Sequence, residues 1–182
     1  MGSEVILILG GARSGKSLFA QQLATALGER VLFIATGAPL DDEMRRRIEL
    51  HKKARPKTWR TVEVATGVAK TMAEHVEDAD VVVIDCLTLL VCNIMDNSQD
   101  PEDIDALESE LAGELSQLLE RKERKRSIII VSNEVGMGLV PDYPAGRAYR
   151  DLLGRANQFI AERADRVYLM IAGIPLQLKG GG

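Results

Sequence analysis

Residues 10 to 17 are Gly10-Gly11-Ala12-Arg13-Ser14-Gly15-Lys16-Ser17. They follow an apolar run, Val5–Leu9, and precede a segment with helical periodicity, Lys16–Leu27, that ends before Gly28. The spacing matches the pattern G-x-x-x-x-G-K-S in the strand-to-helix context that this pattern requires. We therefore predict a phosphate-binding loop, or P-loop, rather than a glycine-rich turn that carries a Lys-Ser pair by chance.

The residue types in this loop suit the phosphates of a nucleotide. Glycines allow consecutive backbone N–H groups to turn toward the phosphates, and the start of the following helix adds partial positive charge. Lys16 is expected to reach the β- and γ-phosphates, and the Ser17 hydroxyl is expected to bind Mg²⁺. The remaining contacts are expected from Gly10, Gly11, Ala12, Arg13, Ser14 and Gly15.

A carboxylate follows a second apolar run. Asp85 comes directly after Val81–Ile84, and a fully buried acid at the end of such a run would be costly. P-loop enzymes need an acid at the end of a nearby strand to hold the metal ion. We therefore predict that Asp85 binds Mg²⁺ with Ser17. The alternative is that Asp85 is the N-cap of a helix over Thr88–Met95.

Strand-like and helical segments alternate along the chain, which is typical of an α/β protein with a mostly parallel sheet and helices on both faces. The strand-like runs are Val5–Leu9, Val31–Ala35, Val81–Ile84, Ile128–Val131 and Val167–Ile171. The helical segments are Lys16–Leu27, Asp42–Lys53, Glu102–Lys125 and Ala145–Ala164. Trp59–Val64 predicts a further strand and Thr66–Val76 a short helix.

Composition predicts one globular domain over residues 1–182. Of the 182 residues, 46% are hydrophobic and 27% are charged, enough for a single core and a charged surface. The net charge of -4 gives no general attraction to nucleic acid or to anionic membranes, so we expect neither as a partner. In the long helical segment, Leu107, Leu111, Leu115, Leu118 and Leu119 form an apolar stripe, which predicts a core contact in preference to a subunit contact.

No membrane anchor is expected, and the cysteines indicate a reducing compartment. The run Val5–Leu9 is too short to span a bilayer, and Ile6 stands where a myristoylation motif requires Ser or Thr. Cys86 and Cys92 match neither a redox pair nor a zinc site, so we expect buried free thiols and a cytoplasmic protein.

Further stretches, together with the P-loop, closely resemble one enzyme family. They are Asp41-Asp42-Glu43-Met44, Arg47–Pro56, Trp59-Arg60-Thr61-Val62-Glu63 and Val131–Pro141, which includes Asn133-Glu134-Val135-Gly136-Met137-Gly138. The chain is similar, over residues 4 to 178, to the adenosylcobinamide kinase/adenosylcobinamide-phosphate guanylyltransferase family. One departure is Gln21, where relatives often carry Glu; it lies beyond the phosphates.

The resemblance implies a bifunctional enzyme of cobalamin biosynthesis. Such an enzyme phosphorylates the aminopropanol hydroxyl of adenosylcobinamide with ATP or GTP. It then transfers GMP from GTP to adenosylcobinamide phosphate, giving adenosylcobinamide-GDP. The resemblance also implies a RecA-like fold and a homotrimer.

The resemblance assigns the covalent guanylylation of that family to His51. A neutral imidazole, with an ordinary pKa near 6.5, presents a nucleophilic nitrogen at neutral pH without needing a base. On a helix that begins near Asp42, His51 shares a face with Met44 and Ile48. That placement alone would also suit a structural histidine at the edge of the core. His75 lies in a charged segment and is expected to be a surface residue.

The resemblance also implies nucleotide contacts along three segments. The turn Thr36-Gly37-Ala38 matches a nucleotide-contacting turn, and Glu63 matches a position that accepts hydrogen bonds from guanine or ribose. Lys52, Lys53, Ala54 and Arg55 match a further nucleotide-binding segment, whose basic groups would lie near the departing pyrophosphate. The alternatives are a plain strand-to-helix loop, a solvent-facing glutamate and a solvated basic helix end. The loop after Val131 is interpreted as lying on the substrate side.

Two other functions fit the P-loop. One is a small-molecule kinase in which His51 is structural and no nucleotide becomes attached to the protein. The other is a RecA-like ATPase switch that moves a macromolecular partner, which the acidic charge and small size disfavour.

Overall fold

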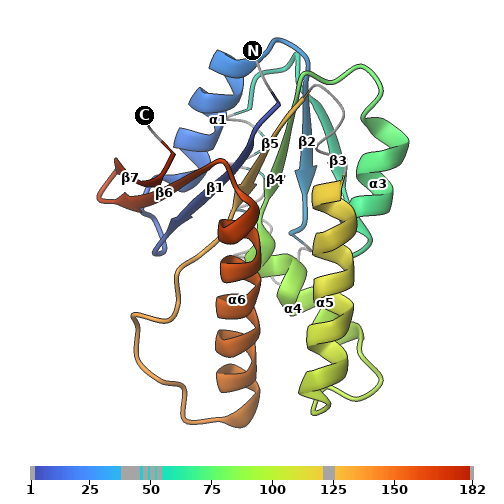
Figure 1. Cartoon of the computed structure of the whole chain (residues 1–182), viewed down its shortest axis with the longest axis vertical. Coiled ribbons are helices and arrows are strands. Elements are labelled where there is room, and N and C mark those ends of the chain that lie inside the picture. Colours follow the sequence, from blue (N-terminus) through green and yellow to red (C-terminus); the bar gives the residue numbers. More distant parts are fainter. Residues whose placement is uncertain are drawn as a thin grey trace.

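The computed structural model describes residues 3–37, 46, 49, 52, 55–120 and 126–180. In that part of the chain, a seven-stranded sheet has the order β3-β2-β4-β5-β1-β6-β7 (Figure 1). Strands β3 through β6 are parallel along this order, and β7 is antiparallel to β6. The strands are β1 (Val5–Gly10), β2 (Val31–Ala35), β3 (Arg60–Glu63), β4 (Val81–Asp85), β5 (Ser127–Val131), β6 (Arg166–Ile171) and β7 (Ile174–Lys179).

Helices cover both faces of the sheet, as the alternation of segments predicted. They are α1 (Lys16–Leu27), α3 (Val68–His75), α4 (Leu87–Asn97), α5 (Ile104–Leu119) and α6 (Pro144–Arg163). Helix α1 packs on one face through Ala20 and Ala24. The other four helices form the layer on the opposite face (Figure 1).

Alternation along the strands explains why this chain forms two apolar layers. Successive strand residues point to opposite faces, so Leu7 and Val82 pack with α3 to α6. Their neighbours Ile8 and Val83 pack with α1. A strand buried on both faces is apolar at every position, which is why the central strands appear as unbroken apolar runs.

Most predicted elements are confirmed, with changes at their ends. The segments Trp59–Val64 and Thr66–Val76 contain β3 and α3. The helix predicted over Glu102–Lys125 begins later, at Ile104, because Asp103 is its N-cap and accepts a hydrogen bond from the Ala106 N–H at 3.0 Å. The described part of α5 ends at Leu119, and its leucine stripe is buried in the core. The predicted helix Asp42–Lys53 lies mostly outside the described residues.

Strand β7 was not predicted from the sequence. It continues from β6 through the two-residue turn Ala172-Gly173, with φ angles of 51° and 83°. All residues of β7 are exposed, so the strand has no buried face to give a strong pattern. Among the described residues, we find no helix with the length and apolar character needed to cross a membrane.

Candidate nucleotide-binding site

The P-loop connects β1 to α1 through backbone conformations that favour glycine. Gly10 has φ 152° and Gly15 has φ 95°, and Arg13 also takes a positive φ of 57°. A Cβ on Gly10 would lie 2.6 Å from the Met170 carbonyl oxygen and 2.6 Å from the Ser14 hydroxyl oxygen. The turn therefore requires glycine at position 10 for both its angle and its space.

Lys16 lies inside the P-loop. Its side chain is largely buried, and its Nζ donates hydrogen bonds to the carbonyl oxygens of Gly10 at 2.9 Å and Gly11 at 2.6 Å. No side chain caps the first turn of α1, where Gly15 is the N-cap. The ammonium group and the backbone N–H groups of that turn are thus gathered at one place, as phosphate binding requires.

The carboxyl ends of three strands meet beside each other. In the sheet register, Ala35 at the end of β2 pairs with both Glu63 of β3 and Asp85 of β4. Asp85 is two residues beyond Val83, which packs on the α1 side, so strand alternation directs Asp85 to that side as well. Helix α1, which begins with Lys16 and Ser17, packs against β4 and β5.

Asp85 is not a helix cap, so the alternative interpretation of this residue is wrong. Helix α4 begins at Leu87 with Cys86 as its N-cap, and no side chain makes a capping hydrogen bond there. Asp85 instead ends β4 on the side where Ser17 begins α1. Carboxylate and hydroxyl oxygens are hard donors that suit Mg²⁺, so this residue pair fits the predicted metal ion.

Lys52 and Glu63 are joined by an ion pair. The Lys52 Nζ lies 2.6 Å from a Glu63 carboxylate oxygen and 3.6 Å from a Glu49 oxygen. The hydrogen bond with Glu63 raises the pKa of Lys52. The contact links the predicted basic segment to the end of β3.

Arg55 lies beside this pair and has unused hydrogen-bond donors. Its guanidinium covers the ring of Phe33 at 3.7 Å from the centroid. Within the described part of the chain, its buried Nε and Nη1 atoms have no hydrogen-bond partner. Burial lowers the pKa of Arg55, while the charges of Asp85 and Glu63 act in the opposite direction. Unpaired buried donors of this kind are costly, which makes an anionic ligand the natural partner.

A depression of about 310 Å³ adjoins Arg55. Its lining includes Lys52, Thr61, Glu63 and the stacked Trp59. Apolar and charged groups therefore border the same space, which suits a ligand with both a flat ring and phosphates.

The turn after β2 is held by its own side chain. Thr36 is fully buried, and its hydroxyl accepts a hydrogen bond from the Cys86 N–H at 2.8 Å and donates one to the Cys86 carbonyl at 2.6 Å. The Thr36 N–H donates to the Asp85 carbonyl at 3.2 Å, and the Thr36 carbonyl accepts a hydrogen bond from Asn93 at 2.9 Å, so the polar groups of Thr36 hold the turn in place. The predicted site residues Ala38, His51, Lys53 and Ala54 lie outside the described residues.

Two other segments support the P-loop. The Glu134 N–H donates to the Gly10 carbonyl at 3.1 Å, which places the loop after β5 next to the phosphate cradle. The Gly173 N–H donates to the Ser14 carbonyl at 3.0 Å, so the turn between β6 and β7 also lies against the P-loop.

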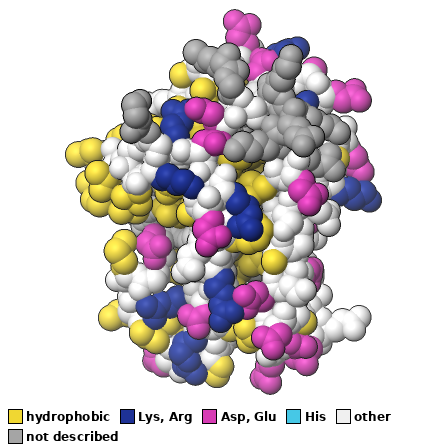
Figure 2. Space-filling view, in the orientation of Figure 1, with side chains coloured by type: hydrophobic (Ala, Val, Ile, Leu, Met, Phe, Trp, Pro, Cys, Tyr) yellow, Lys and Arg dark blue, Asp and Glu magenta, His cyan; other side chains and the backbone are white. Residues whose placement is uncertain are grey.

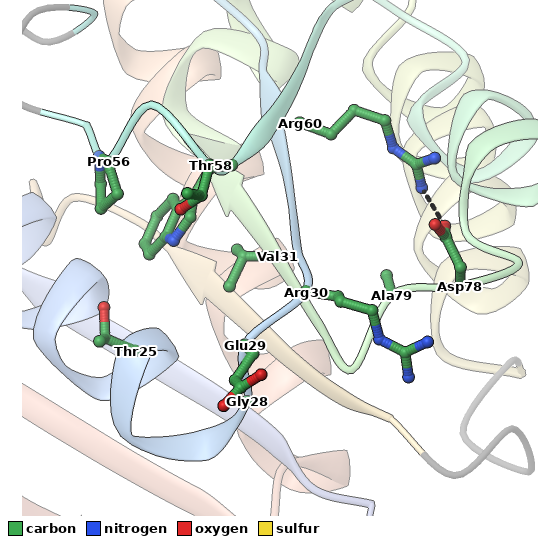
Figure 3. A pocket seen from close by; sticks show the side chains of 11 residues that line it. Thr25, Gly28, Glu29, Arg30, Val31, Pro56, Thr58, Arg60, Asp78 and Ala79 are labelled. Atoms are coloured by element: carbon green, nitrogen blue, oxygen red, sulfur yellow. Dashed lines mark hydrogen bonds and ion pairs between the residues drawn. The ribbon is translucent and has the colours of Figure 1, made fainter.

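A second, larger pocket of about 590 Å³ lies at the amino ends of β2, β3 and β4 (Figure 3). Its lining comes from the end of α1 and from residues that precede β2, β3 and β4, including Arg30, Arg60 and Asp78. Figure 3 shows Arg60 pointing to Asp78, with which it forms an ion pair of 2.8 Å. Open α/β sheets bind ligands outside the carboxyl ends of their strands, whereas this pocket lies at the amino ends.

Comparison with known proteins identifies the family of this chain. A family model described as cobinamide kinase / cobinamide phosphate guanyltransferase matches residues 6–178. The chain belongs to this family. The resemblance stated from the sequence motifs is therefore confirmed.

Relatives within the cobinamide kinase / guanyltransferase family are similar over nearly their whole length. The bifunctional adenosylcobalamin biosynthesis protein CobP of Pseudomonas aeruginosa is 44% identical, covering 96% of each chain. The corresponding protein CobU of Escherichia coli is 39% identical over 96% of this chain and 99% of its own. A solved RadB recombinase is similar in fold alone, with a TM-score of 0.54 and 13% identity over 92% of this chain and 74% of its own.

The sequence alone did not predict the residues that pack against Arg55 or that bond to the turn after β2. Phe33 and Trp59 look like ordinary core residues in the sequence, because stacking beneath Arg55 depends on the pairing of β2 with β3. Asn93 does carry a signal in the sequence, because it is a lone amide within the apolar stretch from Leu87 to Met95.

Proposed function

We propose that the protein carries out two successive reactions of adenosylcobalamin biosynthesis. In the first, the aminopropanol hydroxyl of adenosylcobinamide attacks the γ-phosphate of ATP or GTP, and the nucleoside diphosphate leaves. In the second, GMP passes from GTP to adenosylcobinamide phosphate, with release of pyrophosphate, to give adenosylcobinamide-GDP.

The observation that carries this proposal is the position of Arg55. Its guanidinium lies over Phe33, on the face covered by α1, and is attracted by the charges of Asp85 and Glu63. Two of its nitrogen atoms, Nε and Nη1, have no hydrogen-bond partner among the described residues. A P-loop by itself accounts for one triphosphate site. The additional half-buried cation, with Lys52 beside it, supports a second group of phosphate contacts, which guanylyl transfer with pyrophosphate as leaving group requires.

For the kinase step, we assign phosphate binding to the P-loop. The Lys16 ammonium now bonds to the Gly10 and Gly11 carbonyls, and on nucleotide binding it exchanges these neutral acceptors for anionic phosphate oxygens. Ser17 and Asp85 are the residues that would hold Mg²⁺. When bound, the ion would offset charge on the phosphate oxygens.

For the guanylyl step, we assign the nucleophile to His51. One imidazole nitrogen attacks the α-phosphorus of GTP, a nitrogen–phosphorus bond forms, and the bond to the pyrophosphate oxygen breaks. An oxygen of adenosylcobinamide phosphate then displaces the histidine. Lys52 and Arg55, on the same chain segment as His51, would stabilise the departing pyrophosphate.

The experiment is labelling with GTP that carries the isotope in its α-phosphate. The wild-type protein should retain label after denaturation, and the label should be lost in acid and kept in base, as expected of a phosphoramidate. His51→Ala should abolish both labelling and guanylyl transfer but retain kinase activity. His75→Ala is the matched control, because the chain has two histidines and the His75 ring bonds to the Thr71 carbonyl one turn earlier on α3, at 2.9 Å.

The outcomes separate the proposal from a kinase without guanylyl transfer. Retention of covalent GMP in His51→Ala, or label at His75, would contradict the assignment of the nucleophile. Phosphorylation of adenosylcobinamide without any protein labelling would leave a simple P-loop kinase as the function.

We also propose that the protein is a homotrimer that uses the outer edge of the sheet. Figure 2 shows hydrophobic side chains gathered where Figure 1 places the β6–β7 hairpin. They include Ile171, Ile174, Leu176 and Leu178, each more than half exposed. An exposed apolar edge strand favours pairing with another chain. Light scattering should give three times the mass of the chain, and Leu176→Lys should reduce it.

We place the enzyme in the cytoplasm. Cys86 and Cys92 are free and partly buried, and burial raises the pKa of Cys86 to about 11. Unreactive free thiols suit a reducing compartment. Fractionation of cells that produce the protein would test this placement.

A further inference from the structure

Asn93 is a buried amide whose two hydrogen bonds both leave its own helix. It lies on α4 among Leu90, Val91 and Ile94, and it is 8% exposed. Its Nδ2 donates to the carbonyl of Thr36 at 2.9 Å and to the carbonyl of Ala65 at 2.9 Å. A buried amide is tolerated only where it is bonded in this way.

The two acceptors belong to different strand ends. Thr36 directly follows β2, and Ala65 comes two residues after Glu63, the last residue of β3. Strands β2 and β3 are hydrogen-bonded to each other as far as Ala35, whose carbonyl accepts a hydrogen bond from the Val64 N–H at 3.0 Å. Beyond it, Asn93 supplies a side-chain link between the two departing segments.

The link continues to the end of β4. The Thr36 N–H donates to the Asp85 carbonyl at 3.2 Å, and the Thr36 hydroxyl bonds to both backbone groups of Cys86. A connected series of hydrogen bonds therefore runs from Ala65 through Asn93 and Thr36 to Cys86. Its two ends adjoin Glu63 and Asp85, the carboxylates assigned above to the nucleotide and to the metal ion.

We infer that Asn93 is a positioning residue for the nucleotide site. Helix α4 packs on the face of the sheet opposite α1, so Asn93 acts through the backbone of Thr36 and Ala65 and does not itself touch the nucleotide. Its amide holds the ends of β2 and β3 in the spacing that GTP requires. This inference rests on the proposed function for the location of the site.

Asn93→Asp removes the donated bonds with almost no change in size. The ionised carboxylate would face two carbonyl oxygens, so both segments should move apart, and the affinity for GTP with Mg²⁺ should fall by about tenfold or more. Asn93→Gln, which retains the NH₂ group on a longer side chain, should recover part of this affinity. Thr36→Val should also weaken GTP binding, and the double variant Thr36→Val with Asn93→Asp should lose less than the sum of the two single effects.

Ile94→Ala is the control for a merely structural effect. Ile94 is buried on the same helix at 4% exposure, so its truncation destabilises the fold through a cavity. It should lower the melting temperature at least as much as Asn93→Asp while leaving the GTP affinity within about twofold of wild type. The affinities of all variants, including the reference protein, are measured in a His51→Ala background, where the proposed covalent transfer cannot occur. The method is titration calorimetry with GTP and Mg²⁺, well below the melting temperature.

In the His51→Ala background, calorimetry with GTP reports binding without covalent transfer, so it separates this inference from the chemistry of transfer. If the wild-type protein binds GTP but never becomes labelled, the proposed guanylyl transfer is contradicted. The same titration then still tests the role of Asn93 in GTP binding. If Asn93→Asp does not fold, Asn93→Ser, which retains one donor, takes its place and should show an intermediate loss. A GTP affinity within about twofold of wild type in the folded variant, or an equal loss in Ile94→Ala, overturns the inference.

Discussion

The guanidinium of Arg55 lies 3.7 Å from the ring centroid of Phe33. Trp59 stacks with the same ring at a centroid distance of 6.3 Å. A cation over an aromatic face is attracted by the ring, but its hydrogen-bonding groups remain to be satisfied. The contact between Arg55 and Phe33 therefore keeps a positive charge at the site at some cost in stability. Such charges are common at functional sites.

Arg55→Met should separate binding from stability. Methionine keeps the apolar contact with Phe33 but removes the buried charge, so the free energy of unfolding should stay unchanged or rise by up to about 1 kcal/mol. The affinity for GTP should fall by about tenfold or more because a charge-assisted contact is lost. Urea denaturation and GTP titration measure the two effects. If Arg55→Met binds GTP with wild-type affinity, the assignment of Arg55 to the phosphate site is wrong.

Lys16→Ala should abolish the kinase step without unfolding the protein. The Lys16 ammonium bonds to loop carbonyls and not to the apolar core, whereas phosphoryl transfer needs its charge, so the rate should fall by about 100-fold or more. Phosphorylation of adenosylcobinamide is the measurement, with circular dichroism as the check on folding. Lys70→Ala, at an exposed position of α3, is the control. A nearly normal rate in Lys16→Ala would exclude this P-loop from the reaction.

Asp85→Asn should raise the Mg²⁺ concentration needed for turnover. The amide keeps the shape of the side chain but loses the negative charge that a hard divalent ion prefers, and we expect about a tenfold increase in the half-saturating concentration. The measurement is a Mg²⁺ titration of kinase activity. Asp96→Asn, at an exposed position of α4, should leave the titration unchanged. Equal metal dependence in wild type and Asp85→Asn would contradict the metal role.

Asp80→Asn should lower stability in a pH-dependent way. The hydrogen bond from Arg30, at 2.5 Å, is the main cause that holds the pKa of Asp80 at about 2, below its ordinary value of 3.8. A lowered folded-state pKa stabilises the fold above the ordinary pKa, and this stabilisation is lost as the pH falls from about 4 to about 2.

The free energy of unfolding of the wild type should therefore exceed that of Asp80→Asn by up to about 1 kcal/mol at neutral pH. This difference should vanish near pH 2. Denaturation curves across this range measure it, and added salt should reduce the neutral difference. A difference that grows on acidification would contradict this role of Asp80.

Local patterns were enough to determine the P-loop, the central strands and the α/β class. A phosphate loop is encoded by contiguous residues, from Gly10 to Ser17, and strands such as Val81–Asp85 are buried on both faces and so appear as apolar runs. The short strand Arg60–Glu63 followed from alternation. Strand β7 did not, because each of its residues is exposed and its position depends on pairing with β6.

Only the tertiary structure decided which of the candidate site residues lie near one another. Sequence motifs and the family resemblance named Lys16, Glu63 and Asp85 separately. The strand order and the register place Glu63 and Asp85 on the two strands that flank Ala35. The surroundings of Arg55, whose Nε and Nη1 have no partner among the described residues, and the two bonds of Asn93 likewise arise from contacts between segments far apart in the chain. A sequence specifies local backbone preferences directly, whereas the burial and partners of a polar group exist only after the layers have packed.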